Sequence, residues 1–163
     1  MLSCVLLARN FNLRRTTVDG DADIEYVGFW ARVGAALIDT ILMVVVSIPL
    51  LRLVYAISDL EQQAHTANLV EFAVSYVLPA VLVVLLWIKL SSTPGKMAIG
   101  AVIVDADSGG KPSTTQFVIR YLGYYVSTIP LGLGLIWVGI DPRKQGWHDK
   151  MARTLVIRKK VRP

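Results

Sequence analysis

A single carboxylate stands inside the first long apolar segment of this chain. The segment runs over Val33–Leu51, and Asp39 is its one charged residue. Arg32 precedes Asp39 by seven residues, so two turns of helix would put both side chains on one face, about 10 Å apart along the axis. An ionised carboxylate at membrane depth costs about 2.5–3.5 kcal/mol on insertion scales. Asp39 should therefore face protein or water, or stay protonated.

Two interpretations of Asp39 follow. In the first, the carboxylate binds a proton or a cation, as intramembrane ionisable residues often do. In the second, it forms an ion pair or a hydrogen bond that holds a later segment against the first helix. The candidate basic partners are Arg120, Arg143 and Lys150.

The sequence Trp147-His148-Asp149 raises the question of metal or hydrolase chemistry. The chain has two histidines, and the topology derived below puts His65 on the opposite side of the membrane. We therefore expect no metal site from His148, Asp149 and Asp141. Asp149 is interpreted as the cap of a turn or as the partner of an arginine. Because no Ser/His/Asp or Cys/His nucleophile arrangement is visible, we expect neither enzyme activity nor a cofactor.

Thr93-Pro94-Gly95-Lys96 superficially resembles a phosphate-binding loop. It lacks the spaced second glycine and the hydroxyl residue after the lysine that such loops need. We expect a turn at the exit of a helix instead.

The composition indicates a membrane protein. Of the 163 residues, 54% are hydrophobic and 18% are charged, whereas soluble domains usually carry about 45–50% and about 25%. The net charge of +5 would suggest nucleic-acid binding in a soluble protein. Beside long apolar segments it indicates basic loops in the cytoplasm instead. We therefore expect the lipid bilayer as a partner, and not nucleic acid.

Three apolar stretches organise the chain. The first two predict membrane-spanning helices over about residues 33–52 and 70–89, with Pro79 indicating a kink in the second. The third, over residues 117–140, contains Pro130 and two glycines at its centre, which disfavour a continuous helix.

The remaining segments are shorter or polar. Residues 1–28 are predicted to form a polar, partly disordered tail, and residues 29–160 the membrane domain. Residues 158–163 form a basic tail that anionic lipid headgroups should attract. Ala98–Asp105 and Thr154–Ile157 are predicted to be short strands.

The distribution of charge predicts the topology. Residues 53–88 contain no Lys or Arg, whereas basic residues precede the first helix, follow the second and fill the C-terminus. The positive-inside rule then puts both termini in the cytoplasm, with Trp30 and Trp87 as interfacial belt residues. A basic C-terminus and two strands that pair in one compartment require the third stretch to return to its own side. We expect it to be a re-entrant or interfacial helical hairpin that turns near Pro130.

The predicted fold class is therefore an all-α integral membrane protein. It has two transmembrane helices, a hairpin broken by proline and glycine, and a small cytoplasmic β-hairpin-like element.

The order of these motifs resembles the RDD family, which is named for one arginine and two aspartates. Arg32 and Asp39 match the arginine at the start of the first helix and the first aspartate within it. Asp149 fits the second aspartate best, and Asp141 is the alternative. Further motifs similar to the family pattern are Thr93-Pro94-Gly95-Lys96, Arg120, and Trp147-His148-Asp149 before Thr154-Leu155-Val156.

The resemblance implies a bacterial protein of the inner (plasma) membrane with a proposed transport role, including cation/proton antiport for some members. Two functions stay open. One is a subunit of an ion or small-solute transporter that uses Arg32 and Asp39. Because two spans and a hairpin cannot easily enclose a path for an ion or solute, a transporter would require a homo-oligomer or another membrane protein. The small residues Gly34, Ala35 and Ala36 would suit such packing. The other is a non-transporting scaffold or accessory protein in which the Arg and Asp residues are structural.

Overall fold

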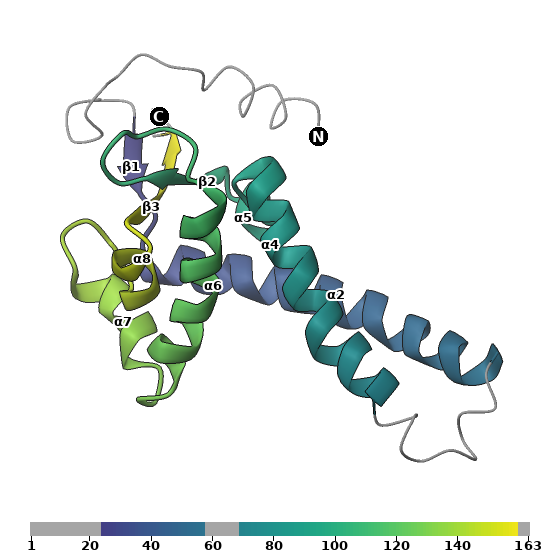
Figure 1. Cartoon of the computed structure of the whole chain (residues 1–163). Helices are drawn as coiled ribbons and strands as arrows, with labels where there is room; N and C mark the ends of the chain where they lie inside the picture. The colour runs from purple at the N-terminus through teal and green to yellow at the C-terminus, as the bar shows by residue number, and fades with distance from the viewer. Residues whose placement is uncertain (1–23, 58–68, 160–163) are drawn as a thin grey trace.

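The computed structural model describes residues 24–57 and 69–159. Within these residues the chain is mostly helical and carries one small antiparallel sheet (Figure 1). The elements in chain order are β1 (Ile24–Tyr26), α2 (Phe29–Ile57), η3 (Ala73–Val77), α4 (Leu78–Leu90), α5 (Pro94–Ala98), β2 (Ala101–Asp105), α6 (Thr114–Thr128), α7 (Leu133–Ile140), α8 (Trp147–Met151) and β3 (Thr154–Lys159).

Two helical segments are long and apolar enough to cross a bilayer. They cover Phe29–Ala56 and Leu69–Leu90, so both predicted spans are confirmed as helices of sufficient length. In the second segment, the π-helical turn η3 ends at Val77, two residues before Pro79. Proline has no N–H to donate to the preceding turn, and a wider π turn is a common local adjustment in such a helix.

These long helices bury few of their apolar side chains within the chain. Leu37, Ile41 and Val45 of α2 and Phe72 near η3 are all more than half exposed. A soluble protein rarely leaves so much contiguous apolar surface in water. In a bilayer the lipid tails cover it, which agrees with the composition.

The third apolar stretch is broken, as its central proline and glycines predict. Helices α6 and α7 meet at an angle of 101°. The turn between them contains Leu131 with φ 53° and Gly132 with φ 74°, and Leu131 is 94% exposed at the tip. Gly134 lets the two helices approach closely, because an added Cβ would lie 2.7 Å from the Cα of Ser127.

The sheet has the strand order β1-β3-β2 with antiparallel pairing throughout. The two predicted strands pair with each other, with Val104 opposite Leu155 in the β2–β3 register. The third strand corrects the expectation of a tail over residues 1–28. Its residues Ile24–Tyr26 pair with β3, and Val27 is fully buried. Residues 1–23 of that predicted tail, and 160–163 of the basic tail, lie outside the described residues.

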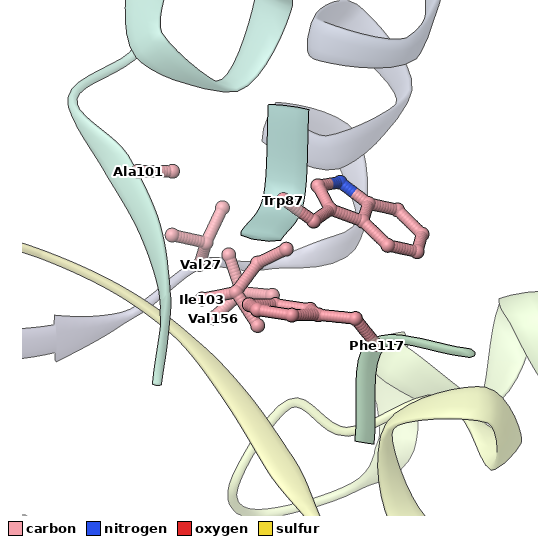
Figure 2. Packing of buried hydrophobic residues seen from close by; sticks show 6 residues of the cluster. All are labelled: Val27, Trp87, Ala101, Ile103, Phe117 and Val156. Carbon is pink, nitrogen blue, oxygen red and sulfur yellow. The ribbon is translucent and has the colours of Figure 1, made fainter. Parts of the chain in front are cut away.

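The main apolar core lies where the sheet meets the ends of α4 and α6 (Figure 2). Phe117 of α6 packs beside Trp87, with ring centroids 6.2 Å apart. The expectation that Trp87 is a belt residue is therefore wrong: it is 2% exposed, because it packs against residues of the sheet and of α6. Trp30, the other predicted belt residue, is 81% exposed. The core residues are Val27, Trp87, Ala101, Ile103, Phe117 and Val156.

Candidate functional site

Arg32 is held at the start of α2 by three separate acceptors. Its Nε donates to the carbonyl oxygen of Val27 at 3.0 Å, and its Nη2 donates to the carbonyl oxygen of Lys144 at 2.7 Å. Its Nη1 lies 2.5 Å from Oδ2 of Asp149. The arginine thus connects the first span to the segment that follows α7.

Asp149 is the centre of a buried ionic cluster. It lies on α8, is fully buried, and pairs with Arg32 through Oδ2 and with Arg120 of α6 through Oδ1. The backbone N–H of Gly146 also donates to Oδ2 at 3.0 Å, so the same carboxylate caps α8. Arg120 in turn donates to Oγ1 of Thr154 in β3 at 2.7 Å. One carboxylate therefore joins α2, α6, α8 and, through Arg120, the sheet.

The pKa of Asp149 reflects this pairing. Burial by itself raises the pKa of a carboxyl group, but Arg120 and then Arg32 outweigh it and hold the pKa of Asp149 well below its usual range. Asp149 is therefore ionised throughout the physiological range, and both arginines keep their counter-charge.

Asp39 has different partners from those that its sequence context predicted. The Oγ1 of Thr93 donates to its Oδ2 at 2.5 Å, and the backbone N–H of Gly95 donates to its Oδ1 at 2.6 Å. Of the three candidate partners Arg120, Arg143 and Lys150, Arg120 pairs with Asp149 and Lys150 pairs with Asp141. The Thr93-Pro94-Gly95-Lys96 segment is thus more than a turn at a helix exit, because it begins α5 and fastens that helix to the first span.

The contact between α2 and α5 depends on Gly95. A Cβ at this position would lie 2.0 Å from the carbonyl oxygen of Ala35. Ala35 is fully buried by this approach. Part of the small-residue face expected to pack between copies of the chain is therefore used within one chain.

Lys96 extends the cluster beside the rings of Trp87 and Tyr124. Its Nζ lies 5.6 Å from the centroid of Trp87 and 3.4 Å from Oγ1 of Thr93. Burial lowers the pKa of Lys96, and Arg120 and Arg32 add to this effect, while Tyr124 and Asp39 oppose it.

Asp141, the alternative second aspartate, lies at the end of α7 and organises the loop before α8. It pairs with Lys150 and accepts hydrogen bonds from the backbone N–H groups of Arg143 and Gln145, both at 3.1 Å. Burial by itself raises the pKa of Asp141, but Lys150 and the two amides lower it overall. Asp141 does not contact Arg32 through any described hydrogen bond, whereas Asp149 does.

His148 lies between Ser127 and Asp149. Its Nδ1 is 3.3 Å from Oγ of Ser127, its Nε2 is 3.6 Å from Oδ2 of Asp149, and its ring stacks on Tyr124 at 4.0 Å. The three residue types are those of a hydrolase triad, which the sequence pattern did not reveal. Ser127 is fully buried, however, and its hydroxyl donates to the carbonyl oxygen of Gly123 at 2.7 Å. The hydroxyl is therefore not presented to a substrate.

We predict that acid destabilises the fold through His148. Its pKa is lowered from 6.5 to about 3, chiefly by burial, with Asp149 opposing the shift and Arg120, Arg32 and Lys96 adding to it. The unfolded imidazole therefore binds more protons than the folded one between pH 6.5 and about 3. Stability rises with pH across that window, by up to about 1.4 kcal/mol per pH unit.

The measurement is the thermal unfolding midpoint of the detergent-solubilised protein from pH 7.5 to 4. The midpoint should fall as the pH drops below 6.5, and a His148→Gln variant should lose most of that slope. A His65→Gln variant removes the chain's other histidine and should keep the slope. An unchanged slope in His148→Gln would contradict the assignment.

Comparison with known proteins identifies the family. The model of the RDD family matches residues 26–153. This chain belongs to the RDD family. Among its relatives, the "Uncharacterized membrane protein YteJ" of Bacillus subtilis (strain 168) is 28% identical over 160 residues, covering 91% of this chain and 94% of the relative. No solved structure matches this chain.

Two other relatives are similar over shorter regions. The "Uncharacterized protein YckC" of Bacillus subtilis (strain 168) is 32% identical over 134 residues, covering 79% of this chain and 82% of the relative. The "Uncharacterized protein RP437" of Rickettsia prowazekii (strain Madrid E) is 29% identical over 91 residues, covering 56% and 50%. The family resemblance seen in the sequence is confirmed, and the chain is a membrane protein of the RDD family.

The sequence pattern of the RDD family indicated the charged members of the site better than the neutral ones. Arg32, Asp149 and Arg120 were singled out from the sequence, and the structure joins them in one cluster. Asp39 lies apart from this cluster, with Thr93 and Gly95 as its partners. Trp87 and Tyr124 were missed, because an aromatic residue in an apolar stretch looks the same whether it faces lipid or a buried cation.

Proposed function

We propose that this RDD protein is a non-transporting scaffold or accessory protein of the bacterial inner membrane. The observation that carries the proposal is that Arg32, Asp39 and Asp149 are each engaged in short contacts within the fold. These contacts hold α2 to α5, α6 and α8. A carboxylate that moves ions must exchange its partners, whereas these carboxylates fasten the elements that carry the sheet. No catalytic step is assigned to the protein, and the sheet is its docking surface.

The shared sheet supports a topology with both termini in the cytoplasm. Strand β1 precedes the first span, β2 follows the second, and β3 follows the α6–α7 pair. Strands that hydrogen-bond to one another lie in one compartment, so the two long helices cross and return, and α6–α7 enters and leaves on the same side. The positive-inside rule makes this side cytoplasmic.

Accessibility of single cysteines to a membrane-impermeant maleimide tests this topology in intact cells. In a Cys4→Ser background, Gln62→Cys should be labelled from outside. Ser108→Cys, in the loop after β2, should react only after the membrane is permeabilised, and so should Arg162→Cys. Labelling of Arg162→Cys in intact cells would overturn the arrangement.

A second candidate function is a subunit of an ion or small-solute transporter. The observation in its favour is Asp39 itself, a half-buried carboxylate within the first span, with a hydroxyl, an amide and Lys96 close by. Because two spans do not enclose a path, this function requires a homo-oligomer or another membrane protein.

Cation flux in liposomes separates the two functions. The purified chain is reconstituted and tested across gradients of Na⁺, K⁺ and pH, beside an Asp39→Asn variant and an Asp107→Asn control that removes an exposed carboxylate. A scaffold should give no flux above that of protein-free liposomes, and Asp39→Asn should lower accumulation of the protein. Flux that the unmodified chain supports, and that equally folded Asp39→Asn lacks, would overturn the scaffold proposal and favour transport.

A further inference from the structure

One edge of the Arg120 guanidinium has no acceptor within the part of the chain that the structure describes. The Nη1 donates to Asp149 and Thr154, but Nε and Nη2 are buried and find no hydrogen-bond acceptor among the described residues. The N–H groups of Nε and Nη2 point side by side along one edge of the guanidinium. Arginine uses this pair of donors to hold a carboxylate or a phosphate through two parallel hydrogen bonds.

The second observation is an excess of positive charge in the neighbourhood of Arg120. The Cζ of Arg120 lies 5.5 Å from the ring centroid of Trp87, and the Nζ of Lys96 lies 5.6 Å from the same centroid. Arg32, Arg120 and Lys96 lie near two carboxylates, Asp149 of the cluster and Asp39, which lies apart from the cluster but close to Lys96. Buried cations that outnumber their counter-charges are unfavourable without a further anion.

The carboxylates of Asp149 and Asp39 already have other hydrogen-bond and ion-pair partners. Asp149 serves both arginines and also accepts from the backbone of Gly146. Asp39 accepts from Thr93 and Gly95, so Lys96 reaches that pair only through the 3.4 Å contact with the threonine hydroxyl. Neither carboxylate is thus available to the free edge of Arg120.

The aromatic side chains offset only part of this charge. The guanidinium lies over Trp87 and Tyr124, at 5.5 and 5.9 Å from their centroids, which are favourable cation–π distances. The Tyr124 hydroxyl also stabilises the charge of Arg120, but it forms no hydrogen bond with Nε or Nη2. A ring face attracts the charge of a cation, but it does not accept the in-plane N–H bonds of Nε and Nη2.

We propose that Arg120 and Lys96, beside the rings of Trp87 and Tyr124, form a binding site for a phosphate-class oxyanion. The oxyanion is either free phosphate or the phosphate group of an anionic lipid. Arg120 is fully buried, whereas Lys96 is partly exposed. An incoming anion therefore contacts Lys96 first and reaches the Nε and Nη2 groups of Arg120 as the lysine side chain moves. The site goes beyond the scaffold function, because anchoring a sheet to a membrane requires no anion.

Thermal unfolding of the purified full chain in a neutral detergent tests the site. One arm titrates sodium phosphate at constant ionic strength, with sodium chloride making up the difference. The other arm adds phosphatidylglycerol or, as its control, phosphatidylcholine. The variants are Lys96→Gln, the charge-conserving Lys96→Arg, and Lys89→Gln, which removes an exposed lysine at the end of α4.

The expected result is a saturable rise of the unfolding midpoint in one of the two arms. The half-saturating concentration should be at least tenfold higher for Lys96→Gln and nearly unchanged for Lys96→Arg and Lys89→Gln. A response to phosphate identifies a free anion as the ligand, and a response to phosphatidylglycerol alone identifies a lipid phosphate.

Three results would overturn the proposal: no rise in either arm, an equal rise with chloride alone, or the same titration curve for Lys96→Gln as for the unmodified chain. If Lys96→Gln does not fold, two measurements on the unmodified chain test the site instead. They are equilibrium dialysis against radiolabelled phosphate and the lipid titration. Absence of saturable binding in both would likewise overturn the site. Anion binding and cation flux are measured separately. The scaffold proposal can therefore fail in the flux measurement while the anion site is supported, and the anion site can fail while the scaffold proposal stands.

Discussion

Replacing Asp149 with asparagine should lower the free energy of unfolding by about 3–5 kcal/mol, because it leaves buried arginines without their counter-charge. Arg120 is fully buried and Arg32 nearly so, and both point their Nη1 atoms at this carboxylate. Asparagine keeps the size of the side chain but removes the charge. The measurement is the unfolding midpoint in detergent, together with the amount of protein that accumulates in the membrane fraction.

A matched control is Asp107→Asn. Asp107 also pairs with an arginine, Arg153, at 2.9 Å, but the two side chains are 59% and 72% exposed. Exposed pairs contribute little, so this change should alter stability by about 0.5 kcal/mol at most. An Asp149→Asn variant that melts as close to the unmodified chain as Asp107→Asn does would contradict the prediction.

A double substitution separates the loss of charge from the loss of packing. Combining Asp149→Asn with Arg120→Met removes one of the buried cations that the single change leaves unpaired. Because an uncompensated buried charge is the main cost, the double variant should be more stable than Asp149→Asn alone. A double variant whose loss equals the sum of the two single losses would show that the residues are not coupled.

Replacing Gly95 with alanine should be the second large effect, with a loss of about 3 kcal/mol or more, because overpacking and lost hydrogen bonds add. The new Cβ would lie 2.0 Å from the backbone oxygen of Ala35 and 2.9 Å from the Cγ of Asp39. The backbone of Ala35 cannot shift aside as the end of a flexible side chain can, so α5 must move away from α2. The move breaks both hydrogen bonds of Asp39. Thermal unfolding in detergent measures the loss.

Gly34→Ala is the control for this change. Gly34 lies on α2 beside Ala35, and a Cβ added there meets nothing within 4 Å. Alanine is favoured over glycine in a helix interior by about 0.5–1 kcal/mol, so this variant should be as stable as the unmodified chain or slightly more stable. If Gly34→Ala and Gly95→Ala lose equal stability, the close approach of α5 is not the cause.

These two changes affect two separate attachments of α2. Asp149 ties the start of α2 to α6 and α8, and Gly95 allows α5 to bind Asp39 about two turns further along the helix. The two family residues Arg32 and Asp39 therefore lie on one helix and serve different neighbours. They do not pair with each other, although their spacing puts them on one face.

Much of the architecture could be predicted from runs of residues along the chain. A charge-free run of apolar residues predicts a span wherever it occurs, and Pro130 with its nearby glycines predicts a broken helix, because both signals are local. Strands β2 and β3 were predicted for the same reason. Strand β1 was missed, because its three residues are too few for a repeating pattern, and they follow an acidic cluster typical of a solvated tail.

The sequence by itself determined that this chain is a membrane protein of RDD type with two helices long and apolar enough to span a bilayer, a broken third stretch, and charges that must find partners. Only the tertiary structure decided which partners they find. Arg32 meets Asp149 across 117 positions of sequence, and Asp39 meets Thr93 and Gly95 across more than 50. The physical reason is that a buried charge is satisfied by whichever donor or counter-ion the packing of distant elements brings within about 3 Å. The periodicity of one helix carries no information about that packing. Asp39, the one charge in an apolar segment, was expected to face protein or water, and it forms hydrogen bonds that link α2 to the segment at the start of α5.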